Sequence, residues 1–94
     1  MEEIRVKLPE GEEVFGVVEQ MLGCRKMYVK CSDGVRRLCR VPGRYARKIW
    51  VKPGDVVIVK PWEIQKDRGD VIFKYTAAQI DWLKRKGYLK FEEI

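Results

Sequence analysis

No histidine occurs anywhere in the 94-residue chain. Histidine is the usual near-neutral acid or base of enzymes and a frequent zinc ligand, so its absence argues against both roles. The one serine, Ser32, and the cysteines have no evident partner that would activate a nucleophile, and no segment has the spacing of a phosphate-binding P-loop. Carboxylates are scattered along the chain. The sequence therefore predicts a protein that is not an enzyme and that binds no cofactor.

Cysteine is scarce and irregularly spaced. The chain has three, Cys24, Cys31 and Cys39, an odd number with no CxxC pair among them. Secreted disulfide scaffolds usually contain an even number of cysteines, and zinc sites have cysteines at characteristic spacings. Without histidine, a zinc site would also lack the residue that commonly completes its ligand set. We expect three reduced thiols in or beside the core, and no metal site.

Long apolar runs are also missing. No stretch approaches the roughly 18 residues that a membrane span needs. The first residues, MEEIRVKLPEGEEV, are acidic and unlike a signal or transit peptide, so we expect a cytoplasmic protein that does not meet a membrane. There is no internal repeat or low-complexity segment. With 46% hydrophobic and 36% charged residues, the chain predicts one small folded domain.

Positive charge is abundant and concentrated. Residues 24–52 contain ten lysines and arginines and a single acid, Asp33, whereas the rest of the chain has ten cations and thirteen acids. A basic segment within a slightly acidic protein is the usual electrostatic signature of a polyphosphate partner. Charge runs also occur as solubilising surface, so this feature favours nucleic-acid binding without deciding it.

The periodicity of the basic segment indicates strands. Residues 14–23 are rich in β-branched and large apolar side chains. Residues 25–31 alternate, with Met27, Val29 and Cys31 on one face and Lys26, Tyr28 and Lys30 on the other.

Asp33-Gly34 lies between two such segments and predicts a two-residue hairpin turn. The return strand, 35–41, carries arginines on both faces, among them Arg37 and Arg40. That distribution favours an edge or sharply coiled strand and leaves the register open.

Turn residues divide the remainder. Pro42-Gly43 ends the third strand, 44–50 predicts one helical turn, and Pro53-Gly54 predicts a type II turn. Two further apolar stretches, 55–62 and 70–76, complete a set of five short strands. Because so helix-poor a chain must protect its strand edges, we expect a small closed barrel.

A helix is predicted after the last strand. Thr76 and Gln79 have the spacing of a capping box, Ala77, Ile80 and Leu83 form an apolar stripe, and Gly87 is placed to end the helix. We expect this helix to pack against the barrel or to plug one end. Its basic last turn suits the helix dipole better than it suggests a binding patch.

Two aromatic residues are candidates for base stacking. Tyr28 lies between Lys26 and Lys30 on the polar face of its strand, and small barrels hold single-stranded nucleic acid by stacking bases on rings and meeting phosphates with cations. A half-exposed strand tyrosine is the plainer interpretation. Trp50 either caps the core or stacks on a base. Trp62 and Trp82 are most simply packing residues.

The sequence resembles a known family. EQMLGCRKMYVKCSDGVRRLCRVPGRYARKIWVKPGDVVIVKPWE resembles the barrel of the archaeal and eukaryotic translation initiation factor 1A, and RVPGR, RKIWVKPGDVVIVKPW and DWLKRKGYL are its most recognisable segments. The resemblance covers roughly residues 4–90. The bacterial factor 1 is a shorter relative without the C-terminal helix. The family's long charged eukaryotic tails have no counterpart here, so the chain looks like the archaeal form.

The resemblance implies a fold and a function. The fold is all-β with a C-terminal helix: a five-stranded OB-fold barrel at 13–75 with a short helical turn after the third strand, a flexible tail at 1–12, and a helix and tail at 76–94 that pack on the barrel. The implied function is non-catalytic. The family binds the small ribosomal subunit at the decoding site and helps to recruit initiator tRNA and messenger RNA.

The implied partner is ribosomal RNA of the small subunit, with initiator tRNA and other initiation factors as further candidates, bound by a monomer. By resemblance the connector RVPGRYARKIWVK is an RNA contact region. The candidate RNA-binding residues are Lys26, Tyr28, Lys30, Arg37, Arg40, Arg44, Arg47, Lys48 and Trp50.

Two alternatives stay open. A single-stranded nucleic-acid chaperone of the cold-shock type would need more stacking residues than Tyr28 on its sheet. A protein-interaction module with an acidic partner would be expected to show an exposed apolar patch, which the sequence does not reveal.

Overall fold

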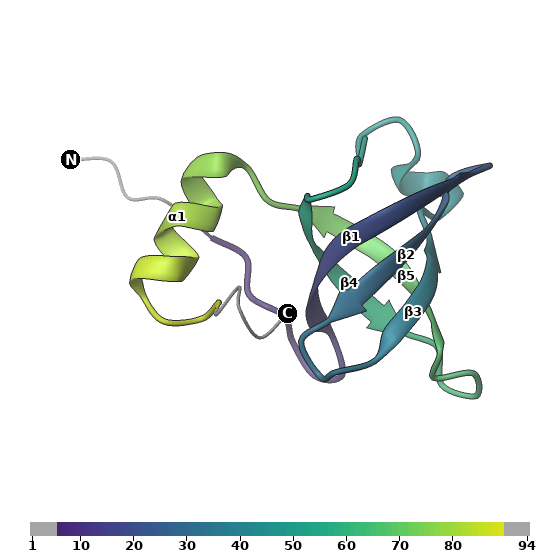
Figure 1. Cartoon of the computed structure of the whole chain (residues 1–94), viewed down its shortest axis with the longest axis horizontal. Helices are drawn as coiled ribbons and strands as arrows, with labels where there is room; N and C mark the ends of the chain where they lie inside the picture. Colours follow the sequence, from purple (N-terminus) through teal and green to yellow (C-terminus); the bar gives the residue numbers. More distant parts are fainter. Residues whose placement is uncertain (1–5, 90–94) are drawn as a thin grey trace.

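The computed structural model describes residues 6–89 and contains a β-barrel followed by one α-helix (Figure 1). Within this range no helix is long and apolar enough to cross a membrane. The elements in chain order are β1 (Val14–Gly23), β2 (Lys26–Cys31), β3 (Arg36–Arg40), the 3-10 helix η1 (Gly43–Tyr45), β4 (Val56–Pro61), β5 (Arg68–Lys74) and α1 (Ala77–Arg85).

The five strands close into a barrel in the order β1-β2-β3-β5-β4. All neighbouring pairs are antiparallel except β3 and β5, which run parallel and place Leu38 opposite Arg68 and Arg40 opposite Asp70. The predicted five-stranded barrel with a C-terminal helix is confirmed. Of the two interpretations of 35–41, an edge strand or a sharply coiled strand, the edge strand is wrong, because β5 pairs with the side of β3 that β2 leaves open.

The turn between β2 and β3 is one residue longer than predicted. The amide of Gly34 donates to the carbonyl of Cys31 at 3.0 Å, and the amide of Cys31 donates to the carbonyl of Val35 at 3.0 Å. Gly34 has a φ of 87°, which a side chain would disfavour. These bonds define a three-residue loop, Ser32 to Gly34, with a glycine bulge, and not a two-residue turn.

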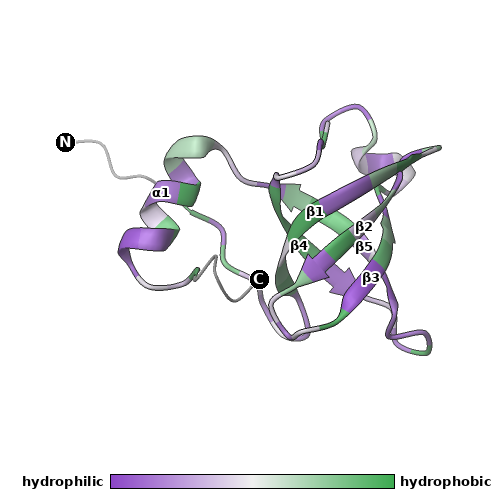
Figure 2. Cartoon of the chain, viewed as in Figure 1, coloured by the Kyte–Doolittle hydropathy of each residue, from purple (hydrophilic) through white to green (hydrophobic). Residues whose placement is uncertain are grey.

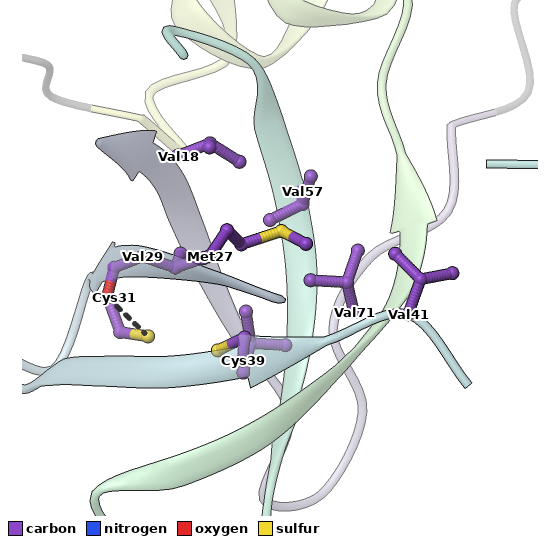
Figure 3. Packing of buried hydrophobic residues seen from close by; sticks show 9 residues of the cluster. Val18, Met27, Val29, Cys31, Cys39, Val41, Val57 and Val71 are labelled. Atoms are coloured by element: carbon purple, nitrogen blue, oxygen red, sulfur yellow. Dashed lines mark hydrogen bonds between the residues drawn. The ribbon is translucent and has the colours of Figure 1, made fainter. Parts of the chain in front are cut away.

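The barrel interior is filled by small and medium apolar side chains (Figure 3). As the alternation of 25–31 predicted, Met27, Val29 and Cys31 point inward. All three cysteines are free thiols, and burial raises the pKa of the Cys39 thiol to about 12. The inner cluster consists of Val18, Met27, Val29, Cys31, Cys39, Val41, Val57, Val59 and Val71.

A second apolar cluster lies outside the barrel, where α1 and the N-terminal segment cover it. Strand β4 serves both clusters, since Val57 and Val59 face inward while Val56 and Ile58 belong to the outer cluster. This explains why four consecutive β4 residues are buried. Figure 2 shows the apolar segments concentrated on the strands and polar residues on most connections.

The C-terminal helix begins and ends as predicted. The amide of Thr76 donates to Oε1 of Gln79 at 2.8 Å, and the amide of Gln79 donates back to Oγ1 of Thr76 at 3.2 Å, which completes the capping box. At the other end Gly87 adopts a φ of 81° and forms a Schellman motif. The apolar stripe is shorter than predicted, because Leu83 is buried but Ala77 is exposed.

Part of the predicted N-terminal tail is fixed to the barrel. The Tyr75 hydroxyl donates to the carbonyl of Lys7, and Val6 and Leu8 pack in the outer cluster. Residues 6–8 therefore lie between the barrel and α1 and link the two. Residues 1–5 and 90–94, which the predicted tails also included, lie outside the described residues.

The close packing of β1 against β2 predicts a steric effect at Gly16. A Cβ there would lie 2.4 Å from Cγ1 of Val29, a stiff side chain inside the closed barrel. We expect Gly16→Ala to lower the free energy of unfolding by about 1–3 kcal/mol, as overpacking does. Gly43→Ala is the control, because a Cβ at that position would meet nothing within 4 Å. Equal urea midpoints for the two variants would contradict the expectation.

Candidate nucleic-acid interface

The connector between β3 and β4 closes one end of the barrel. Tyr45, Ile49 and Val51 pack against the inner cluster. The amide of Tyr45 donates to the carbonyl of Pro42, and the amide of Ile49 donates to the carbonyl of Tyr45, both at 2.9 Å. These bonds form the predicted helical turn. Since these side chains point inward, the residues between them point outward. The exposed side chains of the connector include Arg44, Arg47, Lys48, Trp50 and Lys52.

Trp50 does not cap the core. Its side chain is 75% exposed, although its backbone is held in place because Lys74 Nζ donates to the Trp50 carbonyl at 2.8 Å. Lys74 also forms an ion pair with Asp55, with Lys74 Nζ 3.3 Å from Asp55 Oδ2. Of the two interpretations that the sequence left open, core capping is therefore wrong, and the indole is presented to solvent on a fixed backbone.

The connector is also fixed where it enters β4. The amide of Asp55 donates to the carbonyl of Lys52 at 3.1 Å, and Gly54 has a φ of 92°, as the predicted type II turn requires. The amide of Gly54 further donates to the carbonyl of Val18 at 2.8 Å. The cations of the connector therefore project from a well-anchored segment, which limits the entropy lost when they bind a partner.

The outer faces of β2 and β3 carry a regular set of cations. The register pairs Lys26 with Arg40 and Lys30 with Arg36, and between these rows it pairs Tyr28 with Leu38. Paired residues on adjacent strands lie about 5 Å apart. Four cationic side chains therefore surround one aromatic and one aliphatic side chain. The predicted placement of Lys26, Tyr28 and Lys30 on a common outer face is confirmed.

Tyr28 is less available for stacking than its position suggests. The Arg36 guanidinium lies 3.9 Å from the centre of the Tyr28 ring, and Arg36 Nε is 2.7 Å from Glu19 Oε1. One face of the ring is therefore already covered. Arg36 was not among the candidate residues, because the register of 35–41 was unknown. Had Cys39 been assigned to the barrel interior from the sequence, strand alternation would have placed Arg36, three positions earlier, on the outer face.

Arg37 does not belong to the interface. It is 3% exposed, and its Nη1 and Nη2 donate to the two carboxylate oxygens of Asp33 at 2.9 and 2.8 Å. Its Nε donates to the carbonyl of Lys66 at 2.7 Å. The bond from Arg37 holds the pKa of the Asp33 carboxyl below its usual value. The candidate role of Arg37 in RNA binding is therefore corrected: it joins the β2–β3 turn to the β4–β5 loop.

Several of the remaining candidates are not neutralised by acids. Among residues 6–89, no acidic side chain forms an ion pair with Lys26, Lys30, Arg47 or Lys48. Arg44 lies 5.0 Å from the centre of the Tyr45 ring. Nor does this part of the chain contain a group of His, Cys, Asp and Glu residues able to hold a metal ion. The exposed cations of this surface therefore have the chemistry for phosphate binding.

Comparison with known proteins identifies the family. A family model described as translation initiation factor 1A / IF-1 matches residues 2–93. The chain belongs to this family. It is 57% identical over 90 residues to translation initiation factor 1A of Archaeoglobus fulgidus, covering 94% of this chain and 93% of the relative. The protein of the same name from Pyrococcus abyssi is 54% identical over 92 residues, covering 97% and 81%.

Solved structures agree on the fold. Translation initiation factor IF-1 from the Wolbachia endosymbiont of Brugia malayi superposes with a TM-score of 0.55 and 27% identity, covering 72% of this chain and 82% of that one. YjeQ from Thermotoga maritima superposes with a TM-score of 0.56 at 21% identity, over 68% of this chain and 23% of that one, which shows the barrel fold alone. The resemblance to initiation factor 1A that the sequence suggested is thus confirmed.

Proposed function

We propose that this member of the initiation factor 1A family is a non-catalytic factor of translation initiation. In this proposal it binds the small ribosomal subunit near the decoding site through ribosomal RNA and promotes recruitment of initiator tRNA and messenger RNA. It acts as a monomer in the cytoplasm. The observation that carries the proposal is the fixed cationic connector: Arg47 and Lys48 project from it without acidic partners among the described residues.

The geometry supports binding by shape and charge. Folded RNA presents closely spaced phosphates, which cations meet without reading sequence. The connector and the outer face of β2 and β3 are joined through Arg40 and Val41, so one RNA surface can contact both. Because the barrel is closed and the connector is hydrogen-bonded, the backbone that carries the cations is in place before binding. The factor would then act by occupying its site, and no chemical step is required.

The structure weighs against a cold-shock type chaperone. Such proteins hold single strands on several exposed rings, each contributing roughly 1–3 kcal/mol. On the outer face of β2 and β3 the one ring is Tyr28, and Arg36 already covers one of its faces. A chaperone would bind free single-stranded RNA as tightly as ribosomal subunits, whereas an initiation factor would prefer the small subunit.

We expect binding to the small subunit to weaken steeply with salt. If five cations contact phosphates, with about 0.7 counterions released per contact, a plot of log affinity against log salt should have a slope of roughly −3 to −4. Co-sedimentation with purified small subunits at several salt concentrations measures this slope, with large subunits as the control. A flat response, or equal binding to both subunits, would contradict the proposed function.

A further inference from the structure

Trp62 was expected to be a packing residue, but it lies between two surface depressions. One is shared with Arg40, Lys26 and Arg68, and the other with Arg44 and Ile64. The second has a volume of about 680 Å³, in the range of small-molecule sites. Trp62 is only partly buried, so its indole forms a wall of this cleft.

The indole is held in a fixed orientation. Its Nε1 donates to Asp70 Oδ1 at 3.1 Å, and Arg40 Nε is 3.2 Å from the same oxygen. The Arg40 guanidinium lies 5.4 Å from the centre of the indole. Among residues 6–89 no donor contacts Asp70 Oδ2, and the Asp70 side chain, which lines the cleft, is 27% exposed. One wall is thus a fixed ring, and beside it lies a carboxylate oxygen with free acceptor capacity.

The rest of the cleft combines apolar, cationic and polar groups, the last being the Glu63 carboxylate and the Gln65 amide. Ile64 is 95% exposed and lines the cleft. Pro61 and Ile72 add apolar surface, while Arg44 and Lys60 bring positive charge to the same cleft. A ligand suited to these walls has a flat ring, a hydrogen-bond donor at its edge and a nearby anion.

We infer that the Trp62 cleft binds one unstacked nucleobase that carries an exocyclic amino group. The base stacks on Trp62, its amino group donates to Asp70 Oδ2, and Arg44 or Lys60 meets the adjoining phosphate. Adenine, cytosine and guanine have this donor, whereas uracil has carbonyl oxygens in its place, which the carboxylate repels, and its N3–H lies between two of them. The inference rests on the proposed RNA-binding function and adds a base-selective contact to a surface otherwise suited to phosphates.

The test uses the fluorescence of Trp62 alone. In the full chain, Trp50→Phe and Trp82→Phe leave Trp62 as the single indole, and six-nucleotide oligomers of adenosine, cytidine or uridine are titrated. Stacking should quench the indole, and adenosine and cytidine oligomers should bind roughly tenfold more tightly than uridine oligomers. Equal affinities, or no quenching by any oligomer, would overturn the inference.

Asp70→Asn supplies the decisive variant. Its amide oxygen still accepts from Trp62, but its amide nitrogen now faces the base as a donor, so the preference should shift toward uridine by about tenfold. Asp67→Asn is the matched control, because Asp67 is an exposed acid in the loop just before β5 that does not line the cleft, and the base preference of this variant should not change. An unchanged preference in Asp70→Asn would overturn the inference.

Subunit binding is measured in parallel to separate the two proposals. A parent chain that sediments with the small subunit but shows no base preference contradicts the cleft and leaves the proposed function standing. A parent chain that selects adenosine and does not sediment contradicts the proposed function and supports the cleft as a base site.

Discussion

Changing Arg44, Arg47 and Lys48 together to alanine should weaken binding to the small ribosomal subunit by roughly a hundredfold. Each lost phosphate contact is worth about 1 kcal/mol, and about 3 kcal/mol corresponds to that factor. The slope of log affinity against log salt should become shallower by about 2, at about 0.7 counterions per lost contact. The melting temperature should stay within error, because all three side chains are exposed and such substitutions change stability by no more than about 0.5 kcal/mol.

The matched control removes the same charge elsewhere. Lys7→Ala, Arg85→Ala and Lys86→Ala together also lower the net charge by three, but these residues lie at the N-terminal segment and on or just after α1, away from the connector (Figure 1). We expect this variant to bind nearly as well as the parent. If both triple variants lose the same affinity, the effect follows from net charge and the connector is not the contact region.

Trp50→Ala separates the roles within the connector. The indole is 75% exposed and makes no core contact that would be lost, so the variant should unfold at the parent's temperature. A loss of subunit binding at unchanged stability would assign Trp50 to base stacking, at about 1–3 kcal/mol. A large drop in melting temperature would contradict the structural placement of this side chain.

Local pattern was enough to predict much of the scaffold. Strict alternation at 25–31 identified which side chains point into the barrel, since a strand side chain has only two faces to choose from. The capping box of Thr76 and Gln79 and the turns at Pro53-Gly54 and Gly87 are likewise set by residues within a few positions of each other. Each of these predictions depends on short-range chemistry that the sequence contains directly.

The return strand could not be read in the same way. Alternation assigns an arginine to the polar face by default, and Arg37 lies inside only because Asp33 and the carbonyl of Lys66 satisfy its guanidinium. The second of these partners is 29 residues away. The parallel pairing of β3 with β5, which removed the predicted edge, is equally non-local. Short-range pattern holds no information on either contact.

The tryptophans show the same limit within the candidate site. The residues beside Trp50 and Trp62 in sequence do not reveal what surrounds either indole. Their different surroundings come from side chains at a distance, Lys74 holding the backbone of Trp50 and Asp70 holding the indole of Trp62. The inward residues of the connector, Tyr45 and Ile49, took the core-capping role that the sequence left open for Trp50.

We expect removal of Asp33 from its ion pair with Arg37 to destabilise the protein more than removal of Arg37. The Arg37 side chain is 4% exposed, whereas that of Asp33 is 38% exposed. Asp33→Asn keeps an acceptor for the amide of Val35 but leaves a buried cation without its counter-charge. Breaking a buried pair from one side costs about 3–5 kcal/mol, and because Asp33 is partly hydrated we expect the lower end of that range. For a domain of this size, about 3 kcal/mol lowers the melting temperature by roughly 12–24 °C.

Removing the buried partner should do less harm. Arg37→Met replaces the guanidinium with an apolar side chain of similar length, and the Asp33 carboxylate that remains is exposed enough to be hydrated. We expect a loss of about 1 kcal/mol. The double variant Asp33→Asn, Arg37→Met should therefore be more stable than Asp33→Asn alone, as chemical denaturation of all four proteins would show. Arg37→Met being the most damaging change would contradict this account.

The same pair should make stability sensitive to acid. Because Arg37 lowers the pKa of Asp33 in the folded state, the ion pair contributes stability above the unfolded-state pKa of about 3.9, and this contribution disappears as pH falls through the lower folded-state pKa. The parent should therefore lose stability below about pH 4. In Asp33→Asn this component of the pH dependence should be absent.

Binding by Arg37→Met then tests the composition of the interface. Arg37 is 3% exposed and each of its three nitrogens already donates within the protein, so RNA has little access to its remaining N–H groups. At a temperature where the variant is fully folded, its affinity for the small subunit and its salt slope should match those of the parent. A loss of affinity comparable with that of the connector variants would return Arg37 to the interface, and it would mean that the barrel opens around this residue when RNA binds.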